Sequence, residues 1–259
     1  MTTQNAVSGA CDVPEIHRVR HELHRRSLEV VKVERLTPHM IRVTLAGSDL
    51  EGFVSASPDD HIKISIPGLD GAPVRRDYTP RKYDPAAGTL VLDFVNHEGG
   101  PAAAWARAAK VGDHLDIGGP KGSQIISGNI AHWLLIGDET ALPAIGRRVE
   151  ELSAQSHVTT IVAVSGQEDE QIFETSAQHT AHWVHRPLDK ADDAQGIVSV
   201  LSGMDIPERT FIWVGAEARV AKTVRQYLLE KRGIATQWIK ASGYWVQGQA
   251  DASVKDVSA

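Results

Sequence analysis

The hydrophobic pattern changes its period about halfway along the chain, and this change constrains the fold more than any other feature. Between residues 28 and 119, short apolar–polar alternations are separated by turn residues. From residue 131 onwards, continuous apolar runs alternate with segments of helical periodicity. A period of two indicates strands buried on one face, whereas continuous apolar runs indicate strands covered on both faces. We therefore predict two units of different architecture.

The first unit, over residues 15–122, is predicted to be an antiparallel six-stranded β-barrel. An Ala-rich helix over residues 101–109, with Pro101 in its first turn, interrupts the strands. The isoleucines at positions 62, 64 and 66 are expected to share one buried face. The predicted strands lie at residues 28–33, 40–45, 61–66, 90–95 and 114–117, and a further one carries residues 76–81.

The second unit, over residues 130–248, is predicted to be an α/β domain with a mostly parallel sheet. On its last helix Val220, Val224 and Leu228 share one face, and Gly233 follows at the position of a left-handed C-cap. Residues 249–259 are polar and are expected to form a disordered tail. Strands are predicted at 132–136, 158–164, 211–214 and 236–239, and helices at 142–152 and 217–231.

Composition excludes several classes of function. A formal charge of −6 disfavours nucleic-acid and anionic-membrane binders, which need a positive field. Cys11 is the only cysteine, so an internal disulfide and a multi-thiolate metal site are excluded, and the scattered histidines predict no metal centre. With no apolar run of 18 residues and no signal-peptide pattern in residues 1–14, we expect a cytoplasmic protein without membrane insertion. No repeat or long amphipathic stripe demands a partner, so a monomer is expected.

The segment Arg76-Asp77-Tyr78-Thr79-Pro80-Arg81 carries the residue types that a flavin site needs. Tyr78 offers an aromatic face and Thr79 a hydroxyl group. The two arginines offer charge-assisted donors to phosphate oxygens. Strand alternation places Arg76 and Tyr78 on one face of the strand and Thr79 and Arg81 on the other. A bend or a pleated strand edge must therefore bring both sets to one ligand. The alternative interpretation is an ordinary surface strand.

A second candidate segment, His97-Glu98-Gly99-Gly100-Pro101-Ala102, joins a predicted strand to the Ala-rich helix. Glycine lets the backbone approach a ligand, and the free N–H groups at a helix start attract phosphate oxygens. Taken by itself, the segment is equally explained as a loop that caps a helix.

Together with the run from Gly137 to Ile145 and the terminal Gly243-Tyr244-Trp245, these motifs resemble the siderophore-interacting protein family. The resemblance extends from about residue 18 to residue 248 and includes residues 36–44 and 213–217. It implies an α+β two-domain fold like that of ferredoxin reductases, with an NAD(P)-binding-like C-terminal domain. It also implies bound FAD and the reduction of ferric siderophores, which releases iron as Fe(II).

The resemblance further implies which residues form the site. No side chain is expected to act as nucleophile or general base, since the electron passes from the flavin to Fe(III). Lys63 and Lys121 match positions that are commonly basic and would contact an anionic ferric siderophore, supplemented by Arg147 or Arg148 and by Lys240. The residues implied to bind the flavin are Arg76, Tyr78, Thr79, Arg81, His97, Gly99, Gly100, Ala102, Asp138, Thr140, Ala141, Tyr244 and Trp245.

Two departures from the related pattern concern the electron donor. Asp138 and Glu139 stand where ferredoxin reductases have a glycine-rich loop, and they would repel a cofactor phosphate unless they face elsewhere. Val246-Gln247 stands where family members often have two arginines. NADPH, NADH and reduced ferredoxin therefore all stay open as donors.

Other functions also stay open at this point. One is a flavin oxidoreductase, linked to NAD(P)H or ferredoxin, whose acceptor is not iron. Another is a flavin- or siderophore-binding protein that catalyses nothing. A third is the same fold without its cofactor.

Overall fold

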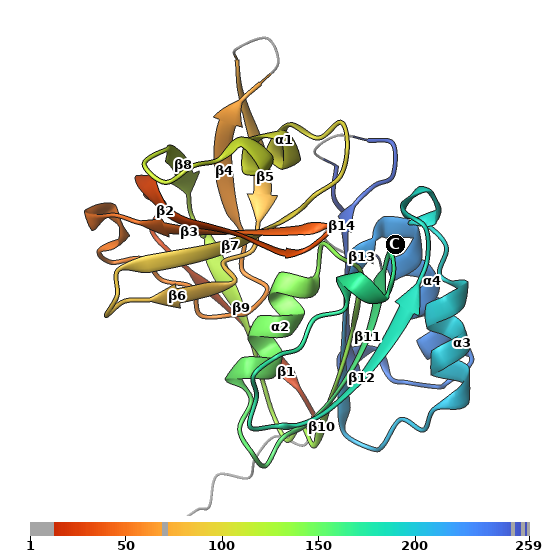
Figure 1. Cartoon of the computed structure of the whole chain (residues 1–259). Helices are drawn as coiled ribbons and strands as arrows, with labels where there is room; N and C mark the ends of the chain where they lie inside the picture. The colour runs from red at the N-terminus through yellow and green to blue at the C-terminus, as the bar shows by residue number, and fades with distance from the viewer. Residues whose placement is uncertain (1–12, 69–71, 250–251, 255–256, 258–259) are drawn as a thin grey trace, which may run out of the picture.

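The N-terminal half of the chain is a curled antiparallel sheet of seven strands in the order β5–β4–β8–β2–β3–β7–β6 (Figure 1). The computed structural model describes residues 13–68, 72–249, 252–254 and 257. The strands are β2 (Arg25–Thr37), β3 (Met40–Ala46), β4 (Ile62–Pro67), β5 (Pro73–Tyr78), β6 (Lys82–Asp84), β7 (Thr89–Val95) and β8 (His114–Gly118).

The sheet therefore has one strand more than the six we predicted. The additional strand, β6, has only three residues and pairs with β7. Three residues are too few to display a hydrophobic period, which explains the difference. The predicted isoleucine face is confirmed, since Ile62, Ile64 and Ile66 are at most 1% exposed. Helix α1 (Pro101–Ala108) adds Ala102 and Ala106 to the same core.

A separate two-stranded sheet pairs β1 (Glu15–Arg20) with β9 (Gly122–Ser127) in antiparallel register. Strand β9 occupies much of the segment 120–130 at which we placed the change between the two units. All six residues of β1 are exposed, so its sequence gives no one-sided hydrophobic period. Cys11 and residues 1–12 lie outside the described residues.

The C-terminal half contains a five-stranded sheet in the order β12–β11–β10–β13–β14, and every pair in it is parallel. The predicted final strand at 236–239 is wrong. Residues Thr236–Trp238 form the 3-10 helix η4, and the strand runs over Ile239–Trp245, where Ser242 and Gly243 weaken the strand pattern. The strands are β10 (His132–Gly137), β11 (His157–Val164), β12 (Gln178–His185), β13 (Thr210–Glu217) and β14 (Ile239–Trp245).

Helices cover both faces of this sheet (Figure 1). Leu134 packs in the cluster of α3 (Gln195–Gly203) and α4 (Ala218–Glu230), whereas Trp133 and Leu135 pack in the cluster of α2 (Leu142–Glu151). The face of the sheet that α2 covers is also the one turned toward the N-terminal half, since Met40 of β3 packs in the same hydrophobic cluster. The predicted apolar face of α4 is buried, and the glycine at 233 has a φ of 66°. The remaining short helices are η1 (Ser48–Leu50), η2 (Gln167–Asp169) and η3 (Leu188–Lys190).

Part of the expected disordered tail is ordered in the structure. The backbones of Val254 and Gly243 exchange two hydrogen bonds of 2.8 Å, and Val257 is only 5% exposed in the α4 cluster. The edge of β14 and the apolar face beside it provide partners that composition could not reveal. Within the described residues, no helix is long and apolar enough to cross a membrane.

Candidate functional site

Tyr78, the last residue of β5, is fixed by an aromatic stack. Its ring lies 4.4 Å from that of Phe94, and Phe94 lies 5.4 Å from Trp105 of α1. Burial raises the pKa of Tyr78, although nearby Arg76 opposes the shift, so the phenol stays neutral at physiological pH. The stack holds one rigid aromatic side chain beside the polar residues that follow.

Within the described residues, Thr79 and Arg76 have donor groups that make no hydrogen bond to another side chain. Thr79 is 8% exposed, and its hydroxyl has no hydrogen-bond partner among the residues that the structure describes. Arg76 donates from Nη1 to the carbonyl of Arg75 at 2.8 Å, which leaves its other guanidinium donors. A hydroxyl group on a largely buried residue, with no hydrogen bond within the described residues, can accept or donate a hydrogen bond to a ligand.

The loop before α1 has the backbone geometry of a phosphate cradle. Gly99 has a φ of 81°, and a Cβ atom at Gly100 would lie 2.5 Å from the imidazole of His97. Helix α1 begins without a side-chain cap, so within the described residues the N–H groups of Ala102 and Ala103 donate no hydrogen bond, whereas that of Ala104 donates to the carbonyl of Gly100 at 2.9 Å. These donors and the positive end of the helix suit the pyrophosphate of a dinucleotide such as FAD.

Asp138 is buried at the end of β10 and is held by hydrogen bonds within the protein. The carboxylate is 2% exposed and accepts hydrogen bonds from the backbone and hydroxyl of Thr140, from the backbone of Glu217 and from Trp245. Ala141, at the start of α2, is fully buried in the core. The polar groups that we predicted at this strand end thus satisfy one another.

Glu139, unlike Asp138, has a buried arginine as its counter-charge among the described residues. Arg186 donates to both of its carboxylate oxygens, at 3.1 and 2.8 Å. Burial and the neighbouring Asp138 raise the pKa of Glu139, and Arg186 opposes them. The two acids therefore no longer argue against a nucleotide cofactor at this edge of the sheet.

The aromatic pair at the end of β14 is held from two sides. Tyr244 meets Trp213 edge-on, at 5.8 Å and 88°, and burial raises the pKa of its phenol well above the usual value. The indole of Trp245 is bound to Asp138 at 2.9 Å. Gln247 donates to Glu217 and to the carbonyl of residue 189, so the residue that replaces a basic one is tied to the fold.

The structure assigns Arg81 a different place from the one we expected. Its guanidinium makes a bidentate ion pair with Glu150 of α2, at 2.7 and 2.5 Å, and is 5% exposed. The carboxylate of Glu150 thus binds the guanidinium donors of Arg81 that we expected to bind a phosphate. Lys240 is likewise paired, with Asp59, and is not part of an open basic pocket.

Lys63 lies at the start of β4, and Lys121 follows the end of the neighbouring strand β8. Lys63 pairs in register with Gly118, three residues before Lys121, and its ammonium lies 3.1 Å from Asp77. The next pair along β4 and β5 joins residue 62 to Tyr78. Both lysines are therefore close in the fold to the predicted flavin segment, and Lys121 is exposed.

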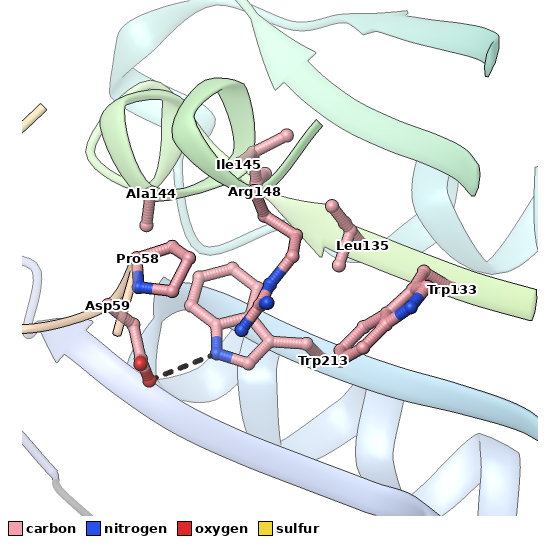
Figure 2. A pocket seen from close by; sticks show the side chains of 8 residues that line it. All are labelled: Pro58, Asp59, Trp133, Leu135, Ala144, Ile145, Arg148 and Trp213. Atoms are coloured by element: carbon pink, nitrogen blue, oxygen red, sulfur yellow. Dashed lines mark hydrogen bonds between the residues drawn. The ribbon is translucent and has the colours of Figure 1, made fainter. Parts of the chain in front are cut away.

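A narrow crevice with a volume of only about 10 Å³ lies between the two halves (Figure 2). Arg148 crosses it with its guanidinium 4.5 Å from the ring of Trp133, and Asp59 accepts a hydrogen bond from Trp213 at 3.2 Å. None of the predicted flavin residues lines it. Sequence reasoning missed Asp59, which has no motif around it. The lining residues are Pro58, Asp59, Trp133, Leu135, Ala144, Ile145, Arg148 and Trp213.

Two family models cover most of the chain. A model described as "Siderophore-interacting protein" matches residues 130–248. A second, "Siderophore-interacting FAD-binding domain", matches residues 29–71 and 67–124. The chain thus carries a FAD-binding domain in its N-terminal half, where Tyr78, Thr79 and the uncapped start of α1 lie.

Relatives and solved structures agree with these matches. An "NADPH-dependent ferric-chelate reductase" of Escherichia coli K12 is 32% identical over 88% of this chain and 95% of its own length. A "Ferric vibriobactin reductase ViuB" of Vibrio cholerae is 27% identical over 91% of this chain and 93% of its own.

A siderophore utilization protein from T. fusca has a TM-score of 0.85 at 34% identity, covering 95% of this chain and 100% of its own. A ferredoxin reductase of carbazole 1,9a-dioxygenase, at 18% identity and a TM-score of 0.64, covers 84% of this chain and 66% of its own and shares the fold. This chain therefore belongs to the siderophore-interacting protein family.

Proposed function

We propose that this chain is a FAD-dependent ferric-siderophore reductase, which reduces bound Fe(III) and so releases Fe(II). The observation that carries the proposal is the pairing of the anchored Tyr78 and the unpartnered Thr79 hydroxyl with the uncapped start of α1. The E. coli and V. cholerae relatives, both described as reductases of ferric complexes, support the choice of acceptor.

The residues of the N-terminal half would contact different parts of FAD. Tyr78 and Thr79 would position the ring system, Arg76 would meet an anionic part, and the loop at Gly99 and Gly100 would receive the pyrophosphate. When bound, FAD can take two electrons from a donor and pass them singly to Fe(III). The protein's contribution is to orient the flavin and to keep Tyr78 neutral beside it.

We assign the two halves different partners. Residues 15–122 would bind FAD, and residues 130–248 would receive the donor at the strand ends near Trp245. NADPH is the proposed donor, which the description of the E. coli relative supports. Arg186 balances the charge of Glu139, and the carboxylate of Asp138 is buried among hydrogen-bond donors, which weakens the repulsion that would oppose a nucleotide phosphate.

An anionic ferric siderophore is the proposed substrate. Lys63 and Lys121 would attract it at the start of β4 and the end of β8, beside the flavin segment. A general flavin oxidoreductase with an organic acceptor is the competing function, and it would need no positive charge there.

Steady-state turnover separates these functions. Purified protein with FAD is mixed with NADPH, NADH or reduced ferredoxin, and with a ferric siderophore and a ferrous chelator. The proposal predicts two Fe(II) formed for each NADPH oxidised, because NADPH gives two electrons and each Fe(III) takes one. Rapid turnover of quinones together with no Fe(II) from any ferric complex would contradict it.

A further inference from the structure

Arg147 of α2 reaches from the C-terminal half to the flavin segment of the N-terminal half. It donates from Nη1 to the carbonyl of Pro80 at 3.1 Å and to the hydroxyl of Ser55 at 2.8 Å. Its Nη2 donates to the carbonyl of Ser55 at 2.8 Å, and its Nε to Glu151 at 2.6 Å. With a side chain only about a tenth exposed, Arg147 uses its whole fork inside the protein.

Glu150, also on α2, holds the next residue of the same segment. It binds Arg81 through two hydrogen bonds, and Arg81 also lies 3.8 Å from Asp93. The approach is close because residue 146 is glycine. A Cβ atom there would lie 2.9 Å from Nη2 of Arg81. Two residues of helix α2 therefore bind residues 80 and 81, Arg147 through the carbonyl of Pro80 and Glu150 through the guanidinium of Arg81.

Covalent geometry links the position of Pro80, which Arg147 holds, to the position of Thr79. The Thr79–Pro80 peptide bond is planar, and the proline ring fixes φ of Pro80. Few soft dihedral angles therefore separate the Pro80 carbonyl, which Arg147 holds, from the Thr79 hydroxyl. Thr79 itself is buried and makes no hydrogen bond within the described residues that would fix its side chain.

We propose that Arg147 and Glu150 are positioning residues for the flavin. They hold Pro80 and Arg81 so that Thr79 keeps the orientation needed to bind the cofactor, which makes flavin affinity depend on the C-terminal half. This inference rests on the proposed binding of FAD by residues 76–81. It replaces the phosphate-binding role that we first predicted for Arg81.

The test measures FAD release from the full-length holoprotein after dilution, followed by the rise in flavin fluorescence. Glu150→Gln removes the charge with almost no change in volume, and Arg147→Gln removes the guanidinium together with its hydrogen bonds to Ser55 and Pro80. Arg148→Gln is the matched control for FAD release, because Arg148 neighbours Arg147 on α2 but stacks on Trp133, and no hydrogen bond or ion pair within the described residues joins it to residues 79–81. The flavin midpoint potential and the melting temperature are measured for each variant.

Loss of a hydrogen bond from a charged group costs enough to speed FAD release by about tenfold in Arg147→Gln and Glu150→Gln. The control variant is expected to release FAD at the wild-type rate. Shifted midpoint potentials in the two test variants alone would support the proposal further.

Wild-type FAD release and potential in both test variants, with only the melting temperature lowered, would overturn the inference and leave a purely structural link. Equal acceleration in Arg148→Gln would overturn it too. If Arg147→Gln does not fold, Glu150→Gln decides the question alone. Because the readout is FAD binding, a failure to reduce ferric siderophores would contradict the proposed function and not this inference.

Discussion

The indole nitrogen of Trp245 donates a hydrogen bond of 2.9 Å to the carboxylate of Asp138, which ties the end of β14 to the end of β10. The two residues are 107 positions apart in sequence. The same carboxylate accepts from the backbone of Glu217, where β13 meets α4. One buried acid thus joins the ends of three neighbouring strands, at the edge of the sheet where we place NADPH.

Asp138→Asn is expected to lower the free energy of unfolding by about 2–3 kcal/mol, because a buried acceptor of several donors is replaced by a group that itself donates. Urea unfolding, followed by far-UV circular dichroism, measures the change. Asp192→Asn is the control, since Asp192 pairs with an arginine that is 79% exposed and should matter little. Equal stability of Asp138→Asn and the wild type would show that the hydrogen bonds to the Asp138 carboxylate are not important for the fold.

Gly146→Ala is expected to destabilise the protein by about 1–3 kcal/mol, even though alanine favours helices. A Cβ atom at this position would lie 2.7 Å from the ring of Phe173 and 2.9 Å from Arg81. Gly203→Ala on α3 is the matched control, because a Cβ atom there meets nothing within 4 Å. Thermal unfolding of both variants gives the comparison. An equal melting temperature for the two would refute the close approach of α2 to Arg81.

Asp59 should make stability depend on acidity. Burial raises its pKa, but the ion pair with Lys240 and hydrogen bonds from Ser57 and Trp213 lower it below the usual range on balance. A carboxyl with a lowered folded-state pKa stabilises the fold above its unfolded-state pKa of about 3.9 and loses that contribution as pH falls through the folded-state value.

We therefore expect the wild-type free energy of unfolding to fall steeply below about pH 4. Asp59→Asn should flatten that fall and should cost about 3 kcal/mol at pH 7, since it leaves Lys240 buried without its counter-charge. Urea titrations between pH 7 and pH 3 measure both effects, with the exposed Asp205→Asn as control. The same slope in Asp59→Asn as in the wild type would contradict this assignment.

Lys63→Ala and Lys121→Ala are each expected to raise KM for an anionic ferric siderophore by about fivefold at low ionic strength, the effect of roughly one surface charge pair. FAD content should not change. The effect should shrink at high salt, where surface charges are screened. Lys231→Ala, on the exposed end of α4, is the control. An unchanged KM at low salt would exclude these two lysines from the substrate site.

Local hydrophobic patterns were sufficient to predict several strands and helices. The isoleucines of β4, the continuous apolar runs of β10 and β11, and the face of α4 were all correctly identified. Strands β9 and β12 and helix α3 were not predicted, nor were β1, which is exposed along its whole length, and β6, which has three residues. The resemblance to the family then supplied what periodicity cannot, namely the cofactor and the reaction.

The internal partners of the site residues could not be predicted. Arg81 and Glu150 are 69 positions apart, and no motif reveals that they meet. An arginine in a suitable motif looks the same whether it binds a phosphate or a carboxylate. The inward direction of Asp138 likewise depends on donors from β13 and β14, which only the folded chain brings together.

The most direct test of the central claim uses the bound flavin as a one-turnover electron source. The holoprotein is photoreduced without oxygen, and ferric siderophores of catecholate, hydroxamate and citrate type are added with a ferrous chelator. The account predicts that the flavin absorbance returns with at least one of these complexes, with two Fe(II) trapped for each flavin reoxidised. A flavin that stays reduced in the presence of every ferric complex, yet is reoxidised by a quinone, would contradict the assignment of this protein as a ferric-siderophore reductase.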